Sequence, residues 1–215
     1  MILTGALDDG TVGISAIKRR GGVTVVQDPD DALFPGMPQS ALECTKVDYC
    51  LPLSEIPPLL ARVVREEVPE EEGAYPVPED MELEHRIASM DETTPDNVEK
   101  LGHPSSYTCP ECNGPLWEIQ DDEVLRFRCR VGHAYTAESM LAGKSEALEG
   151  AMWSALNTLE EGAQMSQRLA ADSRARGHEH AAARFEERAQ KTRGQADLIR
   201  QALSSGTPDV PEDVV

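Results

Sequence analysis

The chain has 215 residues, which is enough for one domain or two small ones, and a formal net charge of −19. Aromatic residues make up only 4% of the sequence, which limits the core that any one part can form. So acidic a surface repels phosphate backbones, which excludes the usual electrostatic route to nucleic acids. No apolar run is long enough to span a bilayer, and no basic region followed by an apolar one marks a signal peptide. We therefore expect a cytoplasmic protein.

Residues 1–66 alternate between apolar strands and short amphipathic helices, which is typical of an α/β fold with a parallel sheet. Continuous apolar strands of this kind are buried on both faces. The predicted strands are Met1–Gly5, Val23–Gln27 and Val47–Leu51, and the predicted helices cover Val12–Arg20, a short stretch from Pro38, and Ile56–Val64. Three strands are marginal for an independent domain, and the first begins at residue 1. We expect a partial parallel sheet, the end of a doubly wound domain, either truncated or completed by another chain.

Residues 67–101 are acidic and rich in proline, as in Glu70-Glu71-Glu72 and Pro76-Val77-Pro78. Such a stretch repels itself and buries little apolar surface, so it is predicted to be a mostly disordered acidic linker. Met81–Met90 could form one short ordered piece within it.

Residues 102–136 contain two close pairs of metal ligands, Cys109 with Cys112 and Cys129 with His133. The segment between the pairs is long enough for two strands joined by a turn at Asp121-Asp122. This spacing indicates a small zinc ribbon, in which three thiolates and one imidazole bind a structural Zn²⁺. The alternative is a set of buried, inert cysteines. The remaining Cys44 and Cys50 are expected to be free thiols in a reduced compartment, and a Cys44–Cys50 disulfide is the alternative.

Residues 137–204 carry apolar residues at intervals of three, four and seven, with Gly177 between two long runs. This pattern predicts a long antiparallel α-hairpin with a seam of small residues. Residues 205–215 are predicted to be a disordered tail.

The first 65 residues resemble the C-terminal end of the catalytic domain of the chemotaxis protein-glutamate methylesterase family. The segments that carry the resemblance are Ile2–Gly10, Gly21-Gly22, Val25–Asp28 and Phe34–Pro38. Residues from about Gly102 onward look like a C-terminal extension carried by some members, and His103–Cys112 is the motif that leads into it.

The resemblance implies a Ser-His-Asp triad that cleaves glutamate methyl esters on chemoreceptors. The family's aspartate lies in a loop of the form T-G-M-G-x-D-G, which reads Thr4-Gly5-Ala6-Leu7-Asp8-Asp9-Gly10 here, so Asp9 takes its place. Ala6 and Leu7 replace the family's methionine and glycine. The resemblance places the serine and the histidine in earlier parts of the family's catalytic domain, and a receiver domain N-terminal to that domain controls it. We expect none of these parts in this chain.

Three functions follow. The first is a methylesterase that is inactive alone, with a methylated chemoreceptor as substrate or a complementing N-terminal methylesterase segment as partner. The second is a zinc-stabilised protein-interaction module in receptor signalling without enzymatic activity. A ribbon that binds nucleic acid is the third, and the acidic composition disfavours it.

Overall fold

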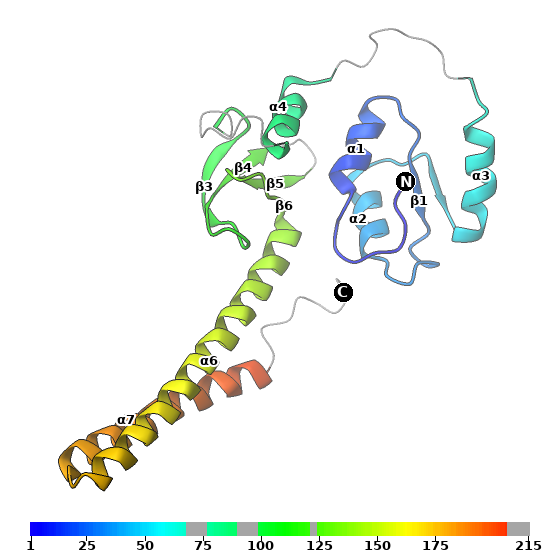
Figure 1. Cartoon of the computed structure of the whole chain (residues 1–215). Coiled ribbons are helices and arrows are strands. Elements are labelled where there is room, and N and C mark those ends of the chain that lie inside the picture. The colour runs from blue at the N-terminus through cyan, green and yellow to red at the C-terminus, as the bar shows by residue number, and fades with distance from the viewer. Residues whose placement is uncertain (68–76, 90–98, 121–123, 206–215) are drawn as a thin grey trace. The chain divides into compact units, whose positions relative to one another are not determined.

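The structure is a computed structural model that describes residues 1–67, 77–89, 99–120 and 124–205. These residues fall into two compact units, one ending at Ala142 and the other beginning at Gly143. Figure 1 shows their helices and strands. Among the described helices, none combines the length and apolar character needed to cross a bilayer.

The N-terminal segment is a partial α/β sheet, as predicted. β1 and β2 pair in parallel, with Val25 opposite Tyr49 and Gln27 opposite Leu51. The predicted first strand is reduced to a single parallel bridge between Ile2 and Val26, because only Ile2 exchanges backbone hydrogen bonds with β1. The elements are α1 (Thr11–Arg19), β1 (Val25–Gln27), α2 (Gly36–Cys44), β2 (Tyr49–Leu51), a 3₁₀ turn (Leu53–Glu55) and α3 (Ile56–Val63).

β1 is covered on both faces, which explains its continuous apolar sequence. Val26 is fully buried in a cluster with Ile2 and Ile14. Val25 belongs to a second cluster with Ile56 and Leu59 of α3. The short strand therefore behaves as the interior strand of a doubly covered sheet.

A ten-residue helix, α4 (Glu79–Ala88), lies within the stretch predicted to be mostly linker. Its fully buried Ile87 packs in a cluster with Trp117 of the ribbon. The short ordered piece expected at Met81–Met90 corresponds to this helix. Much of the rest of the predicted linker, residues 68–76 and 90–98, lies outside the described residues.

The ribbon is a four-stranded antiparallel sheet in the order β3-β4-β5-β6. The sequence predicted the two central strands; β3 and β6 are additional. The expected turn at Asp121-Asp122 lies outside the described residues. The strands are β3 (His103–Thr108), β4 (Pro115–Gln120), β5 (Leu125–Cys129) and β6 (Ala134–Thr136).

Two long helices, α6 (Ala137–Ala175) and α7 (Glu179–Ser204), follow the ribbon. Gly177 has a φ of 77° between them, a conformation that glycine adopts without strain. Ion pairs from Arg174 to Glu186 and from Arg200 to Glu160 show that the helices run antiparallel. Their seam is lined with small buried side chains, which allow close approach: Ala163, Ser166 and Ala170 on α6, and Ala182, Ala189 and Ala196 on α7.

Candidate functional site

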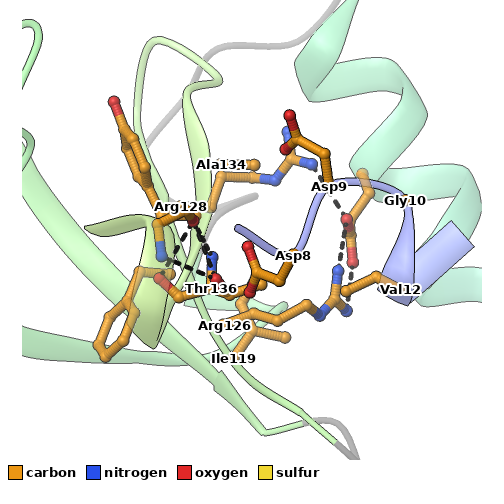
Figure 2. Close-up of a pocket in the computed structure, with 13 residues that line it drawn as sticks. Asp8, Asp9, Gly10, Val12, Ile119, Arg126, Arg128, Ala134 and Thr136 are labelled. Carbon is orange, nitrogen blue, oxygen red and sulfur yellow. Dashed lines mark hydrogen bonds and ion pairs between the residues drawn. The ribbon is translucent and has the colours of Figure 1, made fainter. Parts of the chain in front are cut away.

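The loop that carries Asp9 joins the Ile2 bridge to α1, at the carboxyl edge of the parallel strands, where catalytic groups of α/β folds gather. Asp8, Asp9 and Gly10 of this loop are drawn in Figure 2. Asp9 is exposed, and Gly10 adopts a φ of 85° as the residue that precedes α1. The structure thus presents the Asp9 carboxylate to solvent at the start of a helix.

The Asp9 loop is bound to a second segment of the family resemblance, Phe34–Pro38. The Gly5 amide donates to the carbonyl of Phe34, and the Met37 amide donates to the carbonyl of Gly5. A Cβ added to Gly36 would lie only 3.0 Å from the Leu7 nitrogen, so any larger residue would force the two loops apart by a few tenths of an ångström. Two motifs about 30 residues apart in the sequence therefore form one loop pair.

Leu7 adopts a φ of 59°, in the left-handed region that costs a branched L-residue free energy. It occupies the position where the resemblance has a glycine. The strain therefore marks where this loop departs from the family motif.

Gln27 and Asp31 organise the same edge of the sheet. The Gln27 side chain accepts from the Thr4 amide and donates to the Asp31 carboxylate at 2.9 Å. The Leu53 amide, and after it Gln27, donate to Asp31 and hold its pKa below the usual value. These bonds connect the loops that follow Ile2, β1 and β2.

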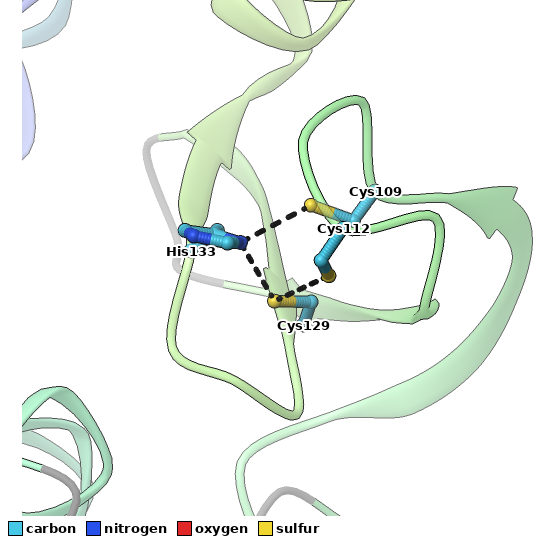
Figure 3. Close-up of side chains that lie close together, drawn as sticks. All are labelled: Cys109, Cys112, Cys129 and His133. Carbon is cyan, nitrogen blue, oxygen red and sulfur yellow. Dashed lines mark hydrogen bonds between the residues drawn. The ribbon is translucent and has the colours of Figure 1, made fainter.

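Cys109, Cys112, Cys129 and His133 converge as the sequence predicted. Their ligand atoms all lie within 4.8 Å of one another. The Sγ atoms of Cys112 and Cys129 are 3.7 Å apart, and His133 Nδ1 lies 3.5 Å from Cys109 Sγ and 3.4 Å from Cys129 Sγ. Figure 3 shows the four side chains facing a common centre. A tetrahedral ion with bonds of about 2.0–2.3 Å requires ligand separations of roughly 3.6–3.8 Å, so the cluster has the dimensions of a metal site.

Each ligand pair lies on a tight turn with one residue at positive φ. Asn113 (φ 56°) follows the first pair, and its amide donates to the carbonyl of Cys109. Gly132 (φ 106°) lies within the second, and its amide donates to the carbonyl of Cys129. Asn113 is followed by Gly114, and asparagine and glycine are the residues that such turns favour.

The environment of the cluster favours thiolate at one buried cysteine and thiol at the other. Burial acts to raise the pKa of Cys109, but the Cys112 amide, which donates to its sulfur, and the Tyr135 hydroxyl, which lies 3.4 Å from its sulfur, outweigh burial and lower the pKa to about 6. Burial raises the pKa of Cys129 to about 11, which the amide of His133 offsets only in part. A cation at the centre would stabilise both thiolates.

The sequence analysis missed two groups that position His133. The Oε2 atom of Glu111 lies 3.1 Å from His133 Nε2, on the side of the ring opposite the cysteines. The Tyr135 hydroxyl donates to Glu111 Oε1 at 2.6 Å. With Nε2 beside this carboxylate, Nδ1 is the ring nitrogen that faces the cluster. Glu111 lies between the first two cysteines and Tyr135 two residues after His133, so their closeness in sequence was the available signal.

A separate ion-pair network fixes α4 on the ribbon. Arg126 and Arg128, both labelled in Figure 2, donate to the carboxylate of Glu84, with distances of 2.8–3.0 Å from Arg126 and 3.0 Å from Arg128. Arg128 also donates to the carbonyl of Gly132, in the turn of the second ligand pair. The network thus connects α4 to the backbone that positions Cys129 and His133.

Comparisons with known proteins confirm the resemblance over the start of the chain. Residues 1–60 match the family model of the CheB methylesterase. A protein-glutamate methylesterase/protein-glutamine glutaminase from Pyrococcus abyssi is 44% identical over 64 residues, which are 30% of this chain and 17% of the relative. A relative from Leptospira interrogans is 51% identical over 63 residues (29% of this chain, 33% of the relative). Another protein-glutamate methylesterase/protein-glutamine glutaminase, from Anaeromyxobacter dehalogenans, is 42% identical over 65 residues, which are 30% of this chain and 18% of the relative.

The chain therefore spans between about a sixth and a third of the length of these curated relatives. No solved structure matches the chain significantly. The family model ends at residue 60, so it includes Asp9 and stops before the Cys/His cluster.

Proposed function

We propose that residues 1–66 are the aspartate-bearing end of a protein-glutamate methylesterase catalytic domain, and that these 215 residues do not hydrolyse glutamate methyl esters by themselves. The observation that carries the proposal is the match of residues 1–60 to the methylesterase family, with Asp9 in the place of the family's aspartate. The exposed position of Asp9 at the carboxyl edge of the parallel strands supports it.

The chemistry needs two more groups. A serine must attack the ester carbonyl, and a histidine must take its proton and deliver it to the departing methanol, while the aspartate orients and stabilises the imidazolium. The first histidine of the chain is His85, beyond the matched stretch. Ser15 is buried in α1, and Ser40 accepts a hydrogen bond from Thr11. Loss of the nucleophile or the base lowers the rate by roughly 10⁶-fold, so Asp9 alone gives no useful catalysis.

The partner in this proposal is an N-terminal methylesterase segment that supplies the serine and the histidine, and the substrate is a methylated chemoreceptor. Backbone groups of Ile2 already bond to β1, so a further parallel strand on the other side of Ile2 would extend the sheet.

The test is complementation in trans. The chain is mixed with the N-terminal part of a relative's catalytic domain, ending before the strand that corresponds to Ile2, and methanol release from methylated receptor is measured. We expect release only from the mixture, its loss with Asp9→Asn, and its persistence with the matched control Asp8→Asn. Release from the chain alone that disappears with Asp9→Asn would refute the proposed inactivity. A mixture that stays inactive although the two pieces bind each other would refute the role of Asp9.

The second candidate function is a zinc-stabilised protein-interaction module in receptor signalling. The Cys/His cluster favours it, because three sulfurs and one imidazole at tetrahedral spacing leave no open position for a reactant and suit a closed structural Zn²⁺ site. When bound, the ion would hold the two ligand turns together. The chain should bind one Zn²⁺, and a Cys109→Ser variant should lose it. Receptor binding that survives Asp9→Asn but not Cys109→Ser would favour this function over the first.

A further inference from the structure

Helix α6 has a second apolar stripe beside the one that packs on α7. Its members recur at alternating intervals of three and four, the spacing of a coiled-coil seam. They are Leu148, Ala151, Ala155, Thr158, Gly162, Met165 and Leu169. All but Gly162 are exposed, and Leu148 and Met165 are 51% and 55% exposed. The stripe is roughly 30 Å long and contains no charged residue.

The stripe differs from an ordinary solvated helix face. The Thr158 hydroxyl donates to the carbonyl of Ser154, which satisfies its hydrogen. Gly162 and the two alanines leave the centre of the stripe shallow, with the larger Leu148 on one side of this centre and Met165 and Leu169 on the other. A shallow centre with a large side chain at each end fits a second helix of the same shape.

We propose that this face of α6 binds a second copy of the chain, with the two α6 helices antiparallel. The charge distribution supports a second copy as the occupant. Residues 143–204 contain nine Lys and Arg and nine Asp and Glu, so the whole excess of 19 negative charges lies elsewhere in the sequence. The hairpin is therefore the part of this acidic chain that can approach its own copy without net repulsion.

The same charges favour the antiparallel direction. In an antiparallel pair centred between Leu156 and Asn157, Leu148 of one copy faces Met165 of the other, and the small residues meet between them. Lys144 of one copy then lies within about one helical turn of Asp172 of its partner. A parallel pair in register would instead place Lys144 against Lys144 and Asp172 against Asp172, which is repulsive.

The test measures the self-association of the full chain by sedimentation equilibrium. We expect the wild type to approach twice 23.5 kDa at tens of micromolar. Leu148→Lys and Met165→Glu should each weaken association at least tenfold, because each places a charge opposite an apolar side chain. The double variant Leu148→Lys/Met165→Glu should recover it, since lysine and glutamate then face each other across both symmetry-related contacts. Leu198→Glu is the control on α7, where a leucine that is 66% exposed lies off the stripe.

Circular dichroism shows whether each variant keeps its helices, which exposed substitutions should not disturb. Recovery by the double variant, with no recovery by Leu148→Lys/Met165→Lys, would support the antiparallel pair. A wild type that stays monomeric at about 200 µM would overturn the proposal, as would a dimer that Leu148→Lys does not weaken. Failure of the double variant to recover would overturn the antiparallel register. None of these outcomes depends on the activity of the Asp9 loop.

Discussion

The contact between Glu111 and His133 predicts how strongly the Cys/His cluster would bind Zn²⁺. Glu111 Oε2 lies 3.1 Å from His133 Nε2, and Oε1 accepts a hydrogen bond from the Tyr135 hydroxyl. Carboxylates that orient a metal-ligating histidine contribute about 10–100-fold to metal affinity. The Glu111 side chain is 60% exposed, so water can replace much of its contact when it is removed. We therefore expect Glu111→Gln to weaken Zn²⁺ binding about tenfold, or about 1.4 kcal/mol, near the lower end of that range.

The assay is a competition for Zn²⁺ between the full chain and a chromophoric chelator at pH 7. Glu118→Gln is the matched control, because it removes the same charge from β4, where Glu118 pairs with Phe127 rather than with a ligand. The affinity of this control should change less than twofold. Equal affinity losses in the two variants would mean that net charge, and not the orientation of His133, sets the effect, and the reasoning would be refuted.

Three further predictions concern stability, each followed by amide hydrogen exchange in the element named. Leu7→Gly should raise the free energy of local opening of the Asp9 loop by about 0.5–1 kcal/mol and so slow its amide exchange, because glycine adopts a φ of 59° without strain. Faster exchange would contradict this. Ile87→Ala should release α4 from the ribbon at a cost of about 2–4 kcal/mol, whereas exposed Glu79→Ala should not. Lys18, then Thr24, lower the pKa of Asp48 to about 2, so its stabilisation of β1 and β2 is present above pH 4 and lost toward pH 2. Asp48→Asn should remove about 1 kcal/mol above pH 4 and abolish that pH dependence, and an unchanged acid profile would refute the assignment.

The sequence predicted those features whose signal is local. The two ligand pairs and the apolar intervals of the long helices each depend on neighbours within a few positions. The structure brings the four ligands together and forms both helices. β1 was recognisable because a strand covered on both faces is apolar throughout. The methylesterase motif was recognisable because Thr4-Gly5 and Asp9-Gly10 keep the residues and the spacing of the family's loop within seven positions.

Contacts between distant residues were not predictable in the same way. Nothing near Glu84 in the sequence indicates that Arg126 and Arg128 will enclose its carboxylate, and an acidic stretch is more often solvated than paired. The fully buried Ile87 explains why α4 packs on the ribbon, because a large apolar side chain on a short helix is buried only by contact with another element. Leu7 was visible as a departure from a motif, but only its backbone conformation shows that the departure is strained.

The net charge of −19, from which the sequence analysis disfavoured nucleic-acid binding, is not spread evenly over the chain. The hairpin from residue 143 to 204 is neutral, so the argument from −19 does not apply to it directly. The local composition leads to the same conclusion. Arg174 and Arg200 form ion pairs with Glu186 and Glu160 between the two helices. Helix α7 contains five basic and four acidic residues, so its excess of positive charge is only one. A surface that binds phosphate needs several cations clustered on one face. In the hairpin these two arginines instead form ion pairs between its own helices, which favours a protein over a nucleic acid as its binding partner.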